Sequence, residues 1–209
     1  MKTSNILVIT YLSLIFGGLA VLYFDDMRHF LKYGRETRTN VVKLHESKVD
    51  LPQFTVIVDT TGYSFSVTSG ENNHFSIVKE STAEISPEIC NVRNDTLFIN
   101  RIPKNSSVKI VCKDIKAIVA KNSEMLSIKD LTSDMLYLKL EKARSSIKNV
   151  KIGAFSFDLS NETHFDASNI TVEVLNGKLF NSYLNIYSSK IRRSSIEQLD
   201  EKKHNMFMH

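Results

Sequence analysis

Residues that could carry acid–base or metal chemistry are scattered along this sequence. Asp158 and Glu173 are the best candidates for a pair of neighbouring carboxylates, although an ordinary charged surface is the interpretation that the sequence favours. No phosphate-binding glycine loop, G-x-S-x-G, H-E-x-x-H or calcium-loop motif occurs. The six histidines lack the three- or four-residue spacing of paired metal ligands: His29, His45, His74, His164, His204 and His209. The sequence therefore predicts no catalytic, cofactor-binding or metal-binding residue and no enzymatic activity.

An apolar pattern returns about every twenty residues through the C-terminal half and predicts a β-solenoid, a chain that coils and stacks on itself. Within each coil the local period is two, since Leu136, Leu138 and Leu140 alternate with Tyr137 and Lys139. Tight bends are expected at 142–146, 160–163 and 176–178, which are rich in small or polar residues. Three apolar columns are predicted: Leu126, Ile147, Phe165, Leu184; Leu131, Val150, Ile170, Ile191; and Leu136, Phe155, Val174, Ile196.

Shorter strands are expected in the preceding segment. Runs of β-branched and aromatic residues, bounded by Gly, Asn, Asp or Pro, predict strands at 55–58, 63–67, 75–78, 96–99 and 108–111. Cys112 alternates with Val108 and Ile110, which is typical of a small buried hydrophobic residue. Cys90 lies about one coil earlier, so a disulfide between adjacent coils remains an alternative, and it would require an oxidising compartment.

The N-terminus carries a long apolar run. Residues 6–24 contain no charge and are long enough to span a hydrocarbon core, so they predict an uncleaved transmembrane signal anchor after a lead at 1–5. A cleaved signal peptide and a buried core helix are the alternatives. The sequence divides further into a juxtamembrane helix or stalk at 25–49, a β-solenoid domain at 50–199 and a flexible tail at 200–209. Basic residues after the span favour a cytoplasmic C-terminal side.

The order of the strands resembles a known family. Residues 51–58, 63–70, 94–99, 107–110 and 134–140 are similar in pattern to the autotransporter adhesin head GIN domain, and the resemblance covers about 50–199. It implies an exported bacterial β-solenoid of Bacteroidetes type with an adhesin-like role. The resemblance also implies that the domain faces the periplasm or the exterior, which is the reverse of the orientation that the basic residues after the span favour. The chain differs from the family in its few turn glycines and its N-terminal anchor without a lipoprotein cysteine.

Charge and composition narrow the function. A net charge of +4 is too small to indicate nucleic-acid binding, and the basic cluster of Arg192, Arg193, Lys202 and Lys203 is better explained as a solvated end of the solenoid. We therefore expect a non-catalytic, single-pass membrane protein of the bacterial cell envelope that binds an envelope polysaccharide or protein. The alternatives are a polysaccharide-active enzyme on a β-helix and a membrane-anchored sensor or regulatory partner. Neither the ligand nor the oligomeric state follows from the sequence.

Overall fold

The solenoid is confirmed in the part of the chain that the structure describes. The computed structural model describes residues 45–79, 89–102 and 106–199, and the backbone of 207–208. These residues form strands and no helix long and apolar enough to cross a membrane. The predicted transmembrane segment, 6–24, lies outside the described residues.

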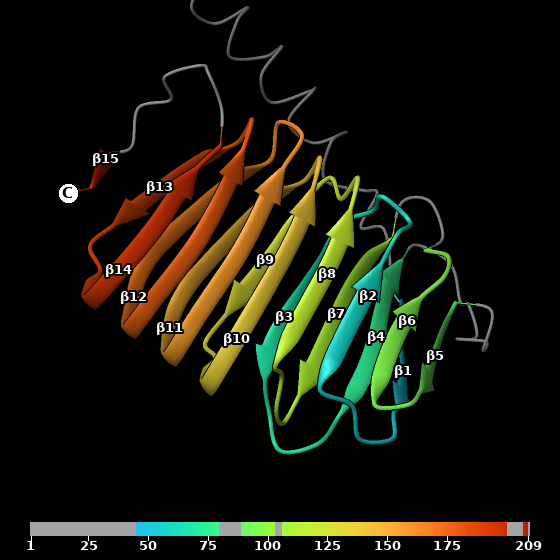
Figure 1. Ribbon diagram of the computed structural model, residues 1–209. Helices are drawn as coiled ribbons and strands as arrows, with labels where there is room; N and C mark the ends of the chain where they lie inside the picture. Colours follow the sequence, from blue (N-terminus) through green and yellow to red (C-terminus); the bar gives the residue numbers. More distant parts are fainter. Residues whose placement is uncertain (1–44, 80–88, 103–105, 200–206, 209) are drawn as a thin grey trace, which may run out of the picture. The chain divides into compact units, whose positions relative to one another are not determined.

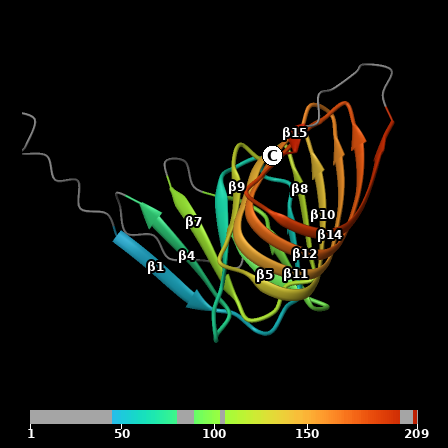
Figure 2. The ribbon, with the colours of Figure 1, turned by 90° about the vertical axis from the view of Figure 1, so that its left-hand side faces the viewer.

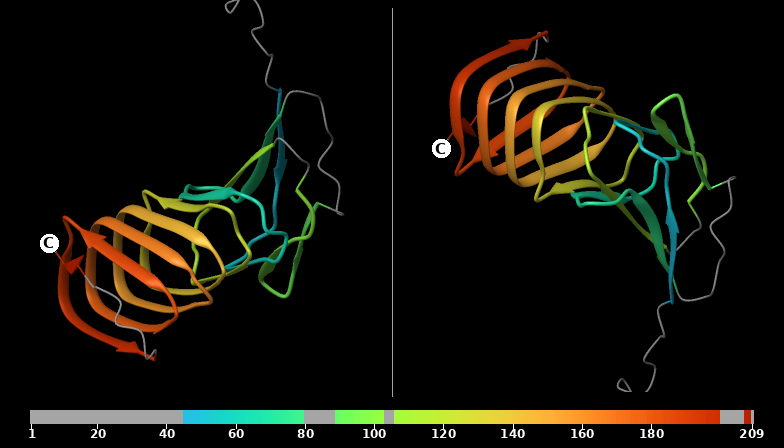
Figure 3. Two further views of the ribbon diagram at one scale, coloured as in Figure 1. Left: turned by 90° about the horizontal axis from the view of Figure 1, so that it is seen from above. Right: turned by 90° about the horizontal axis from the view of Figure 1, so that it is seen from below.

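The C-terminal half builds the regular coils, which Figure 3 shows as stacked loops. Its strands are β8 (Ala117–Lys121), β9 (Leu126–Lys129), β10 (Thr132–Glu141), β11 (Arg144–Ser160), β12 (His164–Phe180), β13 (Tyr183–Tyr187) and β14 (Lys190–Gln198). Parallel pairing runs β8–β10–β11–β12–β14 on one side of each coil and β9–β11–β12–β13 on the other. The strands β11 and β12 bend round the coil and therefore contribute to both sides (Figures 1 and 2).

The register advances by 19 or 20 residues per coil, and this corrects the predicted columns. Leu136 pairs with Phe155 as expected, but Phe155 pairs with Leu175, and Val174 pairs with Ala154. The reason is that β11 and β12 are offset by 20 residues along their whole length, whereas β10 and β11 are offset by 19. Residues 173 and 174 both lack full burial, so the inward alternation shifts by one position there and Leu175 takes the inward place.

The other two columns need the same kind of correction. Phe165 and Leu184 do pair, and so do Val150 and Ile170. Two members leave their columns, since Ile147 pairs with Ala167 and Ile191 with Val172; Ile196, of the column that contains Leu136, pairs with Gly177.

Left-handed residues mark two corners of each coil. One set, with φ between 49° and 56°, comprises Asn122, Lys142, Asn161 and Asn181; the other, with φ between 48° and 55°, comprises Asp130, Asn149, Asn169 and Ser188. Asn and Asp tolerate this conformation better than most residues. The predicted bends near residues 142 and 161 are confirmed.

The predicted bend at 176–178 is wrong, since these residues lie inside β12. Gly177 faces the core there, and a Cβ on it would overlap the Phe157 ring. The glycine makes room for an aromatic side chain and does not serve a turn.

The N-terminal half extends both sides of the solenoid in a different order. Its strands are β1 (His45–Asp50), β2 (Val56–Asp59), β3 (Phe65–Ser69), β4 (His74–Lys79), β5 (Cys90–Arg93), β6 (Thr96–Ile99) and β7 (Ser107–Cys112). The coil made by β2 and β3 lies between β6 and β7 on one flank and β8 and β9 on the other. Antiparallel strands then close this end: β4 and β1 beyond β7, and β5 beyond β6.

Two predicted boundaries change. Residues 45–49 form most of β1 and are not part of a helix or stalk, whereas 25–44 lie outside the described residues. In the tail, expected to be flexible, β15 (Phe207–Met208) pairs in parallel with β13.

One continuous apolar core fills the coils. Its largest members include Phe54, Phe75, Phe155, Phe157 and Phe165, and the last three rings meet at centroid distances of 5.7 to 6.0 Å. Cys90 and Cys112 are buried free thiols, so the alternative of a disulfide is not realised. Burial raises the pKa of Cys90 to about 11 and that of Cys112 to about 12, which keeps both thiols protonated and unreactive.

Candidate ligand-binding groove

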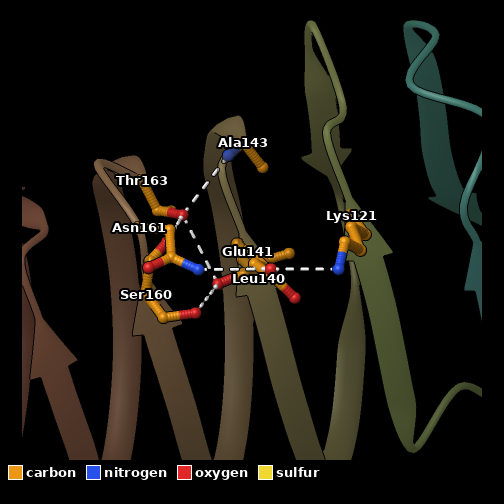
Figure 4. A network of polar contacts seen from close by, with 7 residues as sticks. All are labelled: Lys121, Leu140, Glu141, Ala143, Ser160, Asn161 and Thr163. Carbon is orange, nitrogen blue, oxygen red and sulfur yellow. Dashed lines mark hydrogen bonds and ion pairs between the residues drawn. The ribbon is translucent and has the colours of Figure 1, made fainter.

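A column of small residues lines the inner side of one corner of the coils. Ser123, Ala143, Thr163 and Ser182 lie in successive coils and are buried. Ser123 Oγ donates to Tyr63 O at 2.9 Å, and Thr163 Oγ1 donates to Ser160 O at 2.6 Å and accepts from Ala143 N at 3.3 Å. These bonds satisfy backbone groups that the bend would otherwise leave unpaired, and they hold the outer residues of the corner in place (Figure 4).

Outside this corner runs an open groove of about 480 Å³ across three coils. Its lining combines two acids, two bases and a histidine: Asn122, Ser123, Glu124, Lys142, Ala143, Arg144, Glu162 and His164. The formal charges of its acids and bases cancel. A groove of this kind suits a neutral or mixed polar ligand better than a polyanion.

An aromatic stack stands at one end of the groove. The His164 and Tyr183 rings lie parallel within 25°, with their centroids 4.5 Å apart, because their strands β12 and β13 pair His164 directly with Tyr183. The Nδ1 atom of His164 lies 3.1 Å from Glu162 O, which fixes the ring further. Tyr183 remains 42% exposed. The stack therefore presents a rigid apolar surface beside hydrogen-bonding groups.

A polar ladder borders the groove on the neighbouring side of the coils. Asn161 Nδ2 donates to Glu141 Oε1 at 3.2 Å, and Lys121 Nζ lies 3.1 Å from the same oxygen (Figure 4). The hydrogen bond from Lys121 is the main cause that lowers the pKa of Glu141. This exposed ladder links three coils and fixes the edge of the groove.

A second, smaller hollow lies on the outer face of the side that contains β11, β12 and β14. It has a volume of about 270 Å³ and includes Asp158, Asn176, Lys178 and Glu197 in its lining. Tyr137 Oη donates to Asp158 Oδ2 at 2.6 Å. Burial, with this bond and the Asp158 charge, raises the pKa of Tyr137 to about 12, so the phenol stays protonated and can act only as a hydrogen-bonding group.

The carboxylates singled out in the sequence bind different partners. Asp158 accepts from Tyr137, whereas Glu173 accepts from Arg192 Nη1 at 3.2 Å. Of the histidines, His45 lies in β1, His74 in β4 and His164 in β12, while His29, His204 and His209 lie outside the described residues. Within the described ranges, no group of three or more His, Cys, Asp or Glu side chains could hold a metal ion.

The groove is lined largely by outward residues, whereas the predicted columns consist of inward residues alone, so the groove could not be predicted from them. His164 and Tyr183 are 19 residues apart, one coil in this solenoid, and they occupy equivalent outward positions. Columns of outward residues could have been read in the same way once the register was known. The exact register depends on the bends, and these are weakly encoded.

Comparisons with known proteins find matches among solved structures alone. No family model matches the chain, and no curated protein does. A "putative adhesin" from Parabacteroides merdae is 12% identical with a TM-score of 0.32, the matched region covering 77% of this chain and 98% of that one. A "putative adhesin" from Parabacteroides distasonis is 13% identical with a TM-score of 0.38, covering 75% and 94% respectively.

A third structure, also from Parabacteroides distasonis, bears another description. It is a "putative lipid binding protein", 12% identical with a TM-score of 0.33, and the match covers 76% of this chain and 97% of that one. Likeness at these scores carries no argument about what this chain binds, and membership of the GIN domain family stays a prediction.

Proposed function

We propose that this chain is a non-catalytic binding protein of the cell envelope, and that its groove beside the His164–Tyr183 stack takes a polysaccharide. The stack is the observation that carries the proposal. It offers a flat apolar face next to a groove whose charges cancel, and a sugar ring presents the matching combination of an apolar C–H face and hydroxyl groups. A protein loop with an exposed ring is the alternative ligand.

The length of the groove supports a polymeric ligand. Its lining comes from three successive coils, through Glu124, Arg144 and His164, so polar side chains recur at equivalent positions along the solenoid axis. A polymer whose units repeat along its length can contact such a surface at several points, and weak contacts then add up.

An enzyme on the same scaffold is the second candidate. The groove contains Glu124, Glu162 and His164, which are residue types used in acid–base catalysis. His164 Nδ1, however, faces the backbone oxygen of Glu162, and among the described residues no carboxylate forms a hydrogen bond with the ring, so no acid–base pair is assembled there. The groove is therefore better suited to holding a ligand than to cleaving it.

Binding of fractionated envelope polysaccharides to the full-length chain in detergent tests the proposal. Tyr183→Ala should abolish binding, since it removes one face of the stack. Tyr187→Ala is the matched control: Tyr187 lies on the same strand and is also 42% exposed, but it pairs with Ser168, which does not line the groove, whereas Tyr183 pairs with the groove residue His164. Equal loss in both variants, or in neither, would contradict the assignment of the groove.

We propose further that residues 6–24 anchor the chain in the membrane and that the solenoid faces the periplasm or the exterior. The support is the uncharged apolar run in the sequence. Protease added to intact spheroplasts should digest the solenoid and spare a cytoplasmic marker. Protection until lysis would place the solenoid in the cytoplasm, as the basic residues after the span favour.

A further inference from the structure

The last strand of the solenoid has a free edge. Over residues 190–197, and among the described residues, β14 pairs along one edge alone, with β12, whereas β13 on the other side of the coil pairs with both β12 and β15. Figure 1 shows β14 at one end of the row of strands. An open edge presents unpaired N–H and C=O groups to any strand that can align with it.

The apolar core beneath this edge is partly exposed to solvent. Ile191 and Ile196 are half-buried, although Val172 and Gly177, with which they pair one coil earlier, are fully buried. A further layer of strand would remove both isoleucine side chains from water. The other end of the solenoid differs, because antiparallel strands from the chain itself cover it.

The side chains of β14 select what can form that layer. Arg193, Ser195 and Glu197 occupy alternate exposed positions in register with Val174, Asn176 and Lys178. When two copies of this strand pair antiparallel with Ser195 opposite Ser195, Arg193 of each copy faces Glu197 of the other. Opposite charges directly across a strand pair are stabilising, and the two-fold axis forms this pair twice.

We propose that two copies of the chain join end to end through antiparallel pairing of β14 about a two-fold axis at Ser195. The residues between these positions fit the same register, since Ser194 of each copy then faces Ile196 of the other and covers it. The two solenoids share a continued sheet. This interface is independent of the groove and of its ligand.

A cysteine at the axis tests the pairing in the full-length chain. Ser195→Cys should give a disulfide-linked dimer under mild oxidation by copper-phenanthroline, because residues directly opposite in an antiparallel pair lie within about 5.5 Å. Cys90 and Cys112 are buried and should not contribute to the linked species. The matched control is Ser156→Cys, in the same outward row two coils away from the edge, and it should stay monomeric.

Charge reversal separates specific pairing from chance collision. Arg193→Glu added to Ser195→Cys should cause loss of the linked dimer, and adding Glu197→Arg as well should restore it. The proposal is overturned if the Ser195→Cys chain links no more than the Ser156→Cys chain. It is also overturned if the double charge exchange fails to restore the dimer, an outcome that would mean that the two copies meet in another register.

Discussion

The Phe157 ring occupies the space into which any side chain at residue 177 would extend. Both residues face the core, and they pair across β11 and β12. Gly177→Ala should therefore destabilise the solenoid by about 1–3 kcal/mol through overpacking, as measured by urea denaturation. Adding Phe157→Leu should recover part of this loss. A Gly177→Ala variant as stable as the native chain would show that the ring lies elsewhere.

Substitutions at Phe155 and Ser156 test which residues of β11 face the core. It is 1% exposed and contacts the rings of Phe157 and Phe165, so Phe155→Asp should cost about 3–5 kcal/mol or prevent folding. Ser156 points the other way, and Ser156→Asp should change the unfolding free energy by less than about 0.5 kcal/mol. Thermal unfolding of the two variants measures this difference. Similar melting temperatures for Phe155→Asp and Ser156→Asp would contradict the register.

The buried carboxyl group of Asp59 should make the stability of the folded chain depend on pH. Its carboxylate is fully buried; Oδ1 accepts from Thr61 N and Thr61 Oγ1, and Oδ2 has no hydrogen-bond partner among the residues that the structure describes. Burial raises the pKa of Asp59, while the bonds from Thr61 act in the opposite direction. A raised pKa in the folded state means that the folded chain holds the proton more tightly, so this contribution to stability is full at acid pH and is lost as pH rises.

The Asp59→Asn variant should consequently be at least as stable as the native chain at pH 7, and its stability should fall less between pH 4 and 7 than that of the native chain. Urea denaturation at several pH values measures this. Asp134→Asn, at an exposed position of β10, serves as the control and should leave the pH dependence unchanged. A native chain that gains stability relative to Asp59→Asn as pH rises would show that the carboxylate is stabilised in its charged form.

Substitutions at Asn149 test the left-handed backbone conformation at the corners of the coils. Its φ is 55°, and its side chain accepts from Asn169 Nδ2 at 2.8 Å and donates to Asp130 Oδ1 at 3.2 Å. Asn149→Ala should cost about 1–2 kcal/mol because alanine disfavours this conformation, and Asn149→Gly should cost less. The order should reverse at Asn176, inside β12, where glycine weakens a strand. If glycine costs more than alanine at Asn149, as it should at Asn176, the left-handed corner is contradicted.

The sequence predicted the architecture well because apolar alternation is a strong local signal. Leu136 and Phe155 were placed in one column correctly, as was the pairing of Phe165 with Leu184. The finer register was wrong because β11 and β12 are offset by 20 residues and β10 and β11 by 19, and a difference of one residue between coils leaves little trace in apolar alternation. Gly177 was misread for a related reason: a glycine that accommodates a ring resembles one that makes a turn.

The order of the first coils was beyond local reasoning. The hydrophobic pattern predicted β2 and β6 as strands, but it could not show that β6 stacks outside β2. That arrangement depends on pairing between segments far apart in the sequence, which alternation alone does not encode. The groove was missed for the same reason, because Glu124, Arg144 and His164 meet only when the coils are aligned.

Binding and turnover, measured together on one sample, test the central claim most directly. The full-length chain in detergent is mixed with envelope polysaccharide; the bound fraction is determined, and the polymer is then recovered and its chain length compared with that of untreated material. We predict that the polymer binds and is recovered at unchanged length, and that Tyr183→Ala abolishes binding. Shortened polymer whose appearance depends on Glu124, Glu162 or His164 would contradict this account and establish an enzyme.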